Sequence, residues 1–248
     1  MKKIYDQLVE GLQAHFKKSG HTKAVIGVSG GIDSAVVLKL AVDALGALNV
    51  TGILMPEKSV SRTINIEHAK KLCSFLGANY HTIFINKHLL EFQLLPWEQN
   101  LESVINVKPR VRMVILYNFA NAHGAQVLGT SNKSEFLLGY GTKYGDLAAD
   151  VEVIGELLKT DVWKLAKYMG LPDEIIEKKP SAELYKDQTD EQEMGFTYDK
   201  LDQVLAKYKD GMEPLIDKGM NPQLVHFVFQ KIKQNKHKTT MPPIIKIK

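Results

Sequence analysis

The sequence contains a single cysteine, Cys73, among 248 residues. That count excludes a disulfide framework and a metal site built from cysteines, and it favours a reducing cytoplasmic location. No apolar run approaches the roughly 20 residues that a membrane-spanning helix needs. The N-terminal stretch also lacks the apolar core of a signal peptide. We therefore expect a cytoplasmic protein that makes no use of a membrane.

The excess of positive over negative charge is also small, because the formal net charge is only +4. Such a weak and dispersed excess suits anionic small molecules and gives no support for a nucleic-acid partner. The hydrophobic fraction of 44% and the charged fraction of 24% are ordinary for a globular protein. We expect one domain covering residues 1–248.

Hydrophobic periodicity predicts helices that alternate with short apolar strands. The expected strands cover residues 24–28, 50–55, 80–85 and 126–129, and the expected helices cover 4–16, 32–45, 61–76, 89–95 and 109–124, with Pro109 in the first turn of the last. This alternation predicts an α/β fold, a doubly wound parallel sheet flanked by helices, of Rossmann-like type. Ligands of such sheets bind outside the carboxyl ends of the strands.

The pattern changes after residue 135 and predicts a C-terminal extension of helices and loops. Residues 139–146 form a polar loop punctuated by glycines, a type often used for binding. Short helices are expected over 161–168, 173–177 and 201–208, and a last helix from Pro222. We expect residues 85–97 and 181–195 to become ordered on ligand binding.

The stretch Ser29-Gly30-Gly31-Ile32-Asp33-Ser34 follows a buried strand and opens a helix. A turn of this kind aims free backbone N–H groups and the positive end of a helix dipole at one point, which suits a polyphosphate. No lysine follows the second glycine, so the motif is not a GxxxxGK[ST] loop, and Asp33 stands where a metal could be held. The motif resembles the pyrophosphate loop of ATP pyrophosphatases, which cleave ATP between its α and β phosphates and have the adenine nucleotide α-hydrolase-like fold.

A second polar stretch, Thr130 to Glu135, follows another predicted strand. Because both stretches lie at carboxyl ends of parallel strands, we expect them to face one crevice. Two carboxylates, Asp33 and Glu135, together with phosphate oxygens and water suit octahedral Mg²⁺.

Further motifs make the resemblance specific: Gly129 to Glu135, Thr142 to Asp146, Asp150, and Asn235 to Lys238. With these the chain resembles bacterial NAD synthetases of the short, ammonia-dependent type over nearly its full length. The resemblance implies a carbon–nitrogen ligase that adenylates the nicotinate carboxylate of deamido-NAD with ATP and releases pyrophosphate. Ammonia then displaces AMP to leave NAD. It also implies a homodimer with Mg²⁺ as cofactor. We expect no separate glutaminase domain, because nothing precedes the first predicted helix.

The same resemblance implies roles for individual residues, none of them an acid, base or nucleophile. The positions matching ATP-binding residues are Gly27, Val28, Ser29, Gly30, Gly31, Ile32, Asp33, Ser34, Thr130, Lys159 and Ser181. The positions matching deamido-NAD-binding residues are Arg110, Lys143, Asp150, His237 and Lys238. Asp33 and Glu135 match the magnesium ligands. Ser131-Asn132-Lys133 departs from the Asp-His-Ala of other bacterial members, and we assign no role to Ser131 or Asn132.

Two other interpretations stay open on the sequence. Another ATP pyrophosphatase could amidate or thiolate a different acceptor, such as a guanylate precursor or a tRNA. The thiolating version normally needs cysteines, and this chain has one. A non-catalytic ATP-binding module would have no need of two separated carboxylates for magnesium, so Asp33 and Glu135 favour an enzyme.

Overall fold

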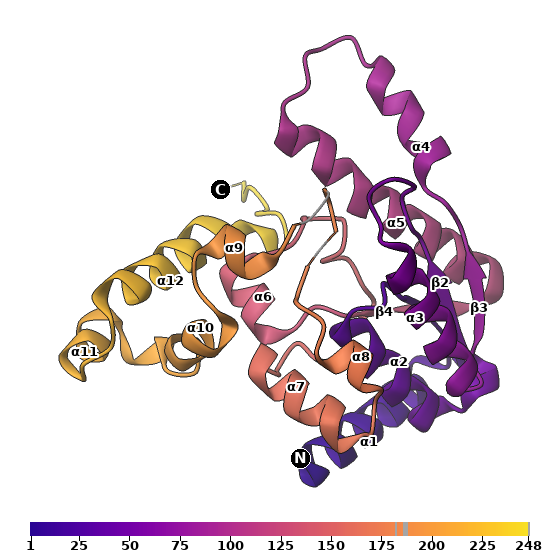
Figure 1. Cartoon of the computed structure of the whole chain (residues 1–248), viewed down its shortest axis with the longest axis horizontal. Helices are drawn as coiled ribbons and strands as arrows, with labels where there is room; N and C mark the ends of the chain where they lie inside the picture. Colours follow the sequence, from indigo (N-terminus) through magenta and orange to yellow (C-terminus); the bar gives the residue numbers. More distant parts are fainter. Residues whose placement is uncertain (182, 186–187, 248) are drawn as a thin grey trace.

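Parallel strands form one five-stranded sheet in the order β3-β2-β1-β4-β5 (Figure 1). The computed structural model describes residues 1–181, 183–185 and 188–247. The strands are β1 (Lys23–Gly27), β2 (Val50–Leu54), β3 (Asn79–Thr82), β4 (Ala125–Gly129) and β5 (Val151–Glu152). In the centre β1 pairs with both β2 and β4, with Ala24 opposite Val50 and Gln126. The order therefore reverses between β1 and β4, where such sheets bind ligands.

The helices cover both faces of the sheet, which confirms the predicted α/β fold. They are α1 (Lys2–Ser19), α2 (Ile32–Leu45), α3 (Thr63–Phe75), α4 (Asn86–Leu90), α5 (Leu101–His123), α6 (Lys133–Leu138), α7 (Lys159–Tyr168), α8 (Asp173–Ile176), α9 (Asp190–Met194), α10 (Tyr198–Leu205), α11 (Met212–Asp217) and α12 (Pro222–Asn235), with 3-10 turns η1 (Ala47–Asn49), η2 (Glu91–Leu94), η3 (Tyr208–Asp210) and η4 (Lys236–Lys238). No described helix has both the length and the apolar character required to cross a bilayer.

Alternate side chains of the central strands serve two separate cores, as the pleat of a buried sheet requires. Ala24 and Ile26 of β1 pack with α1, α2, α3 and α7 on one face. Val25 of the same strand packs with α4 and α5 on the other face. A third core holds the C-terminal helices α9 to α12 together with α6. These helices form the lobe beside the sheet in Figure 1, which confirms the predicted helical extension.

Several details of the predicted fold were wrong. The third strand ends at Thr82 instead of residue 85, and helices α6, α9 and α11 were not predicted. Helix α5 begins at Leu101, capped by the Asn100 side chain, and Pro109 lies inside it instead of in its first turn. Packing against the sheet favours one continuous helix over the start that a proline in the first turn suggests. The short strand β5 was not predicted, because two residues are too few to show an alternation of apolar and polar side chains. The ordering expected for residues 181–195 includes 182, 186 and 187, which lie outside the described residues, and it stays a prediction.

Candidate active site

A cavity of about 260 Å³ opens where the sheet order reverses. The loop after β1, the loop after β4, helix α5 and the segment after α8 all contribute to its wall. Of the residues predicted to bind ATP, all but Gly30 line the cavity: Gly27, Val28, Ser29, Gly31, Ile32, Asp33, Ser34, Thr130, Lys159 and Ser181. Glu135 lines it too. Parallel strands have thus brought the two predicted motifs to one crevice.

The glycine-rich loop presents backbone donors to this cavity. Helix α2 has Gly31 at its N-cap and no side chain that accepts from its first N–H groups, so these donors stay available for an anion. The loop's own hydroxyls hold its shape: Ser34 Oγ donates to Gly31 O at 3.0 Å, and the Gly31 N–H donates to Ser29 Oγ at 3.2 Å. Gly30 has φ +78°, and a Cβ there would lie 2.4 Å from Asn65 O. Only glycine fits that position.

Asn132 connects the two predicted magnesium ligands. It caps α6 in a capping box, with its side-chain oxygen accepting from Glu135 N at 3.0 Å and Glu135 Oε2 accepting from Asn132 N at 3.2 Å. Its Nδ2 donates to Asp33 Oδ1 at 2.9 Å. One side chain therefore orients both carboxylates. Sequence reasoning assigned Asn132 no role, although an Asn followed three residues later by Glu is the signature of a capping box.

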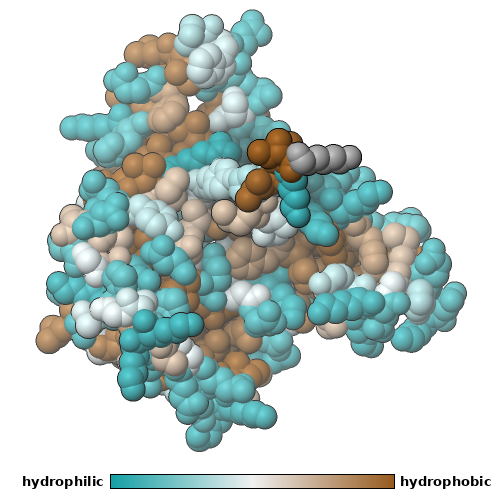
Figure 2. Space-filling model, turned by 180° about the vertical axis from the view of Figure 1, so that it is seen from behind, coloured by the Kyte–Doolittle hydropathy of each residue, from teal (hydrophilic) through white to brown (hydrophobic). Residues whose placement is uncertain are grey.

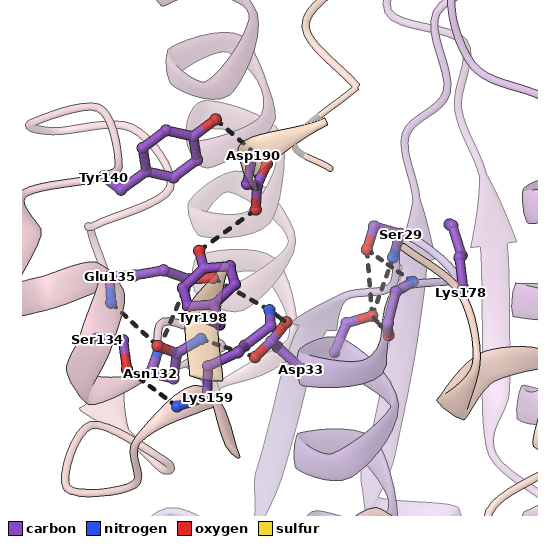
Figure 3. A network of polar contacts seen from close by, with 12 residues as sticks. Ser29, Asp33, Asn132, Ser134, Glu135, Tyr140, Lys159, Lys178, Asp190 and Tyr198 are labelled. Carbon is purple, nitrogen blue, oxygen red and sulfur yellow. Dashed lines mark hydrogen bonds and ion pairs between the residues drawn. The ribbon is translucent and has the colours of Figure 1, made fainter. Parts of the chain in front are cut away.

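Lys159 lies between the same two carboxylates (Figure 3). Its Nζ is 2.5 Å from Asp33 Oδ2 and 3.4 Å from Glu135 Oε1, and the side chain is only 2% exposed. Burial alone would lower the pKa of Lys159, but the two carboxylates outweigh it and raise this pKa above its ordinary value. Burial and the Asp33 charge raise the pKa of Glu135, against the attraction of Lys159. Lys159 is therefore a fixed counter-ion of Asp33 and Glu135.

A buried carboxylate fixes the start of the helix that carries this lysine. Asp202 of α10 accepts from Ser134 Oγ at 2.5 Å and from Thr160 N at 2.8 Å. Ser134 Oγ in turn accepts from Lys159 N at 3.0 Å. Through these bonds α6, α7 and α10 hold the lysine in place.

A second set of polar residues, which sequence reasoning missed, stands above this cluster in Figure 3. Asp190 lines the cavity and is 4% exposed. It accepts from Tyr140 OH at 3.2 Å and from Tyr198 OH at 3.4 Å. The Tyr198 ring lies under Lys159 Nζ, 5.3 Å from its centroid. These residues come from separate elements, so no local spacing in the sequence could have joined them.

The residues predicted to bind deamido-NAD lie outside the wall of the cavity. Three of them form a chain of contacts: Arg110 Nε donates to Lys143 O at 3.3 Å, and Lys143 Nζ donates to His237 O at 2.7 Å. Lys238 Nζ donates to Gly139 O at 2.9 Å. The C-terminal turn η4 therefore contacts the glycine-punctuated loop after α6.

Asp150 is held by backbone as well as by a side chain. Its Oδ2 accepts from Val127 N at 2.8 Å, and its Oδ1 accepts from Tyr117 OH at 3.3 Å. Burial and Asp150 raise the pKa of Tyr117 to about 12. In this structure Asp150 ties the beginning of β5 to β4 and α5.

Asp33 and Glu135, the predicted magnesium ligands, both line the cavity. Within the described part of the chain no group of three or more histidine, cysteine, aspartate or glutamate side chains forms a complete metal cage. A pair of carboxylates fits Mg²⁺, which takes few protein ligands and completes its shell with phosphate oxygens and water.

The fold and the site together define an α/β protein with a loop suited to a nucleotide polyphosphate at the switch point of its sheet. The sequence profile of the NAD synthase family matches residues 4–242. The chain belongs to that family.

Individual relatives share almost the whole chain. An NH3-dependent NAD⁺ synthetase of Fusobacterium nucleatum is 43% identical over 251 residues, covering 100% of this chain and 97% of the relative. The structure of an NH3-dependent NAD synthetase from Campylobacter jejuni is similar with a TM-score of 0.85 at 36% identity, over 99% of both chains. The structure of an NMN synthetase from Francisella tularensis is similar with a TM-score of 0.88 at 31% identity, over 99% of this chain and 98% of the other.

Proposed function

We propose that this protein catalyses the ATP-dependent amidation of deamido-NAD to NAD with ammonia, releasing AMP and pyrophosphate. The observation that carries the proposal is the meeting of the Ser29–Ser34 loop with Asp33 and Glu135 in one cavity. Identity of 43% to an NH3-dependent NAD⁺ synthetase supports the choice of acceptor and nitrogen source.

The reaction needs two displacements. A carboxylate accepts ammonia poorly because oxide would have to leave, so its oxygen first bonds to the α-phosphorus of ATP while the bond from that phosphorus to the bridging oxygen breaks. Pyrophosphate leaves with the electron pair. Ammonia then adds to the carbonyl carbon, AMP leaves, and the nitrogen loses a proton. Positioning and electrostatic stabilisation supply most of this without a covalent protein intermediate.

The residues of the cavity divide this work. The loop's backbone N–H groups bind phosphate oxygens, Asn132 orients Asp33, and Lys159 holds Asp33 and Glu135 together. Asp33 and Glu135 would hold Mg²⁺, which when bound neutralises charge on the phosphates. Arg110, Lys143, Asp150, His237 and Lys238 would bind deamido-NAD.

The nitrogen source is free ammonia or ammonia from another protein. The single cysteine, Cys73, is buried in α3, and burial raises the pKa of its thiol to about 11. A thiol of this kind is a poor nucleophile for glutamine hydrolysis. Ammonium is therefore the substrate to supply in an assay.

The protein acts as a homodimer in this proposal. Exposed apolar side chains, among them Leu94, Trp97 and Leu101 at 78%, 60% and 69% exposure, lie on η2, the following loop and the start of α5. Hydrophobic side chains appear near the top of the molecule in Figure 2, where α4 and this part of α5 lie. An apolar patch of this kind is typical of an interface, and sedimentation velocity tests it.

A second candidate acceptor is the mononucleotide counterpart, nicotinate mononucleotide. The similarity to an NMN synthetase at a TM-score of 0.88 favours testing it. The experiment supplies ATP, Mg²⁺ and ammonium with either acceptor and measures AMP and the amidated product. Faster turnover of deamido-NAD supports the proposal, and turnover of the mononucleotide alone would assign the second function.

A further inference from the structure

The phosphate loop has no lysine of its own, although its ligand would carry several negative charges. In this loop the residue after the second glycine is Ile32, and no cation stands before Ser34. The backbone donors and helix dipole supply partial positive charge only. Besides a bound Mg²⁺, any full positive charge for the β- and γ-phosphates has to come from a side chain outside the loop.

Lys159 does not meet this need. Its Nζ is already paired with Asp33 and Glu135, at 2.5 Å and 3.4 Å. Figure 3 shows its ammonium among these residues, set apart from Ser29 and the turn of the loop. A lysine with two carboxylate partners presents little net charge to a third anion.

Lys178, from the segment that follows α8, reaches the loop directly. Its Nζ donates to Gly30 O at 3.2 Å across 148 residues of sequence, and its side chain lines the cavity. Figure 3 shows Lys178 beside Ser29. The side chain is 20% exposed, and its carboxylate neighbour, Glu183, is 3.9 Å away. The ammonium donates to one carbonyl, and its carboxylate neighbour is distant. It can therefore donate further hydrogen bonds to an anion and interact with the anion's charge.

The surroundings leave the charge of this amine incompletely balanced. Burial lowers the pKa of Lys178, as does the positive charge of Arg62, while Glu183 opposes them. The Glu183 carboxylate is engaged elsewhere too, because it accepts from Asn65 Nδ2. An incoming phosphate would therefore supply the close negative partner that Lys178 lacks.

We infer that Lys178 is the cation of the phosphate loop, binding the β- and γ-phosphates of ATP and the pyrophosphate that leaves. The inference rests on the proposed function for the identity of the nucleotide. In the adenylation step the bond from the α-phosphorus to the bridging oxygen breaks, and the charge that develops on pyrophosphate falls beside the Gly30 turn. Lys178 then stabilises the leaving group.

Pyrophosphate binding in the presence of Mg²⁺, measured by isothermal titration calorimetry, tests the inference. Loss of a charge-assisted hydrogen bond predicts that Lys178→Met weakens pyrophosphate binding roughly 10- to 100-fold. AMP binding should change less than twofold, and Lys178→Arg should retain most of the pyrophosphate affinity. Lys179→Met is the matched control, since Lys179 is a neighbouring, exposed lysine that also lines the cavity. Lys179→Met should weaken pyrophosphate binding much less than Lys178→Met does.

Glu183→Gln separates a ligand-binding role from a structural one. If Lys178 only holds its segment in place through Glu183, Glu183→Gln weakens pyrophosphate binding as much as Lys178→Met does. If Lys178 binds phosphate, removal of the competing carboxylate leaves the affinity equal or higher. Unchanged pyrophosphate binding in Lys178→Met, or an equal loss in Lys179→Met, would overturn the inference.

A parallel assay of NAD formation by the unaltered protein keeps the two claims apart. Pyrophosphate binding that depends on Lys178 without NAD formation contradicts the proposed function alone. If Lys178→Met does not fold, Lys178→Gln retains a polar side chain without the charge and serves in its place.

Discussion

Asp33 Oδ2 lies 2.5 Å from Lys159 Nζ, so the aspartate of the glycine loop is ion-paired to a buried lysine 126 residues away. This pair joins the first strand-loop-helix unit to the C-terminal half of the chain. Glu135 shares the same lysine at 3.4 Å. The site is thus held together by opposite charges before any nucleotide or metal arrives.

Replacing the shared cation should destabilise the fold. Lys159→Met leaves two neighbouring carboxylates without their counter-ion, and removal of one partner from a buried ion pair costs about 3–5 kcal/mol. Urea unfolding measures the loss. The double variant Lys159→Met/Glu135→Gln removes one of the stranded charges and should recover part of the stability. Equal stability of the single variant and the original protein would show that the lysine is not a counter-ion.

Asp33→Asn should abolish adenylation and leave the fold intact. The substitution removes a metal-binding charge, and charge stabilisation by a bound metal is worth several kcal/mol, or roughly a hundredfold or more in rate. Pyrophosphate release in the presence of ATP and deamido-NAD measures the step, and circular dichroism checks the fold. Near-normal turnover would exclude Asp33 as a magnesium ligand.

Asn132→Ala should lower both stability and activity. Loss of an N-cap costs about 1 kcal/mol, and loss of the Nδ2 donor frees the Asp33 carboxylate to reorient. Asn221→Ala is a matched control, because Asn221 caps α12 by accepting from Leu224 N at 3.2 Å. We expect similar stability losses, with slower NAD formation in Asn132→Ala only. Equal activities would show that Asn132 is a helix cap and nothing more.

Glu152, at the end of β5, should make stability depend on pH. Its Oε2 is buried without a hydrogen-bond partner among the described residues, and burial raises the pKa of Glu152 from 4.5 to about 7. The folded state then binds the proton more tightly than the unfolded chain does. The contribution of Glu152 to unfolding free energy is therefore most favourable below pH 4.5, declines between pH 4.5 and 7, and is least favourable above pH 7.

Glu152→Gln keeps the shape of the side chain and removes its charge. At pH 8 the variant should be more stable than the original protein by roughly 1–3 kcal/mol, and the difference should shrink toward pH 5. Urea unfolding across this range measures it, and other titrating groups cancel in the comparison. A difference independent of pH would contradict a buried, ionising Glu152.

The sequence predicted the part of the site that local chemistry encodes. A strand that turns through Gly30 and Gly31 into a helix has a recognisable pattern, and strand alternation placed Glu135 at the same edge of the sheet. The tertiary partners of these residues had no such signal. Lys178 contacts Gly30 across 148 residues, and Asp190 meets Tyr140 across 50.

The roles of the lysines show the same limit. The resemblance matched Lys159 to an ATP-binding position, and only the fold shows that its ammonium is paired with Asp33 and Glu135. The prediction that Pro109 begins a helix was wrong for a related reason, since tertiary packing outweighs a local start signal. Asn132 is different, because its capping box could have been predicted from the sequence. Only its hydrogen bond to Asp33 could not be predicted without the fold.

The most direct test of the account is the product analysis of one reaction. Purified protein is incubated with ATP, Mg²⁺ and deamido-NAD, with ammonium or glutamine as the nitrogen source, and NAD, AMP and pyrophosphate are quantified. We predict equal amounts of the three products with ammonium and little NAD with glutamine. Pyrophosphate release that does not require deamido-NAD, or formation of ADP in place of AMP, would contradict the proposed amidation of deamido-NAD.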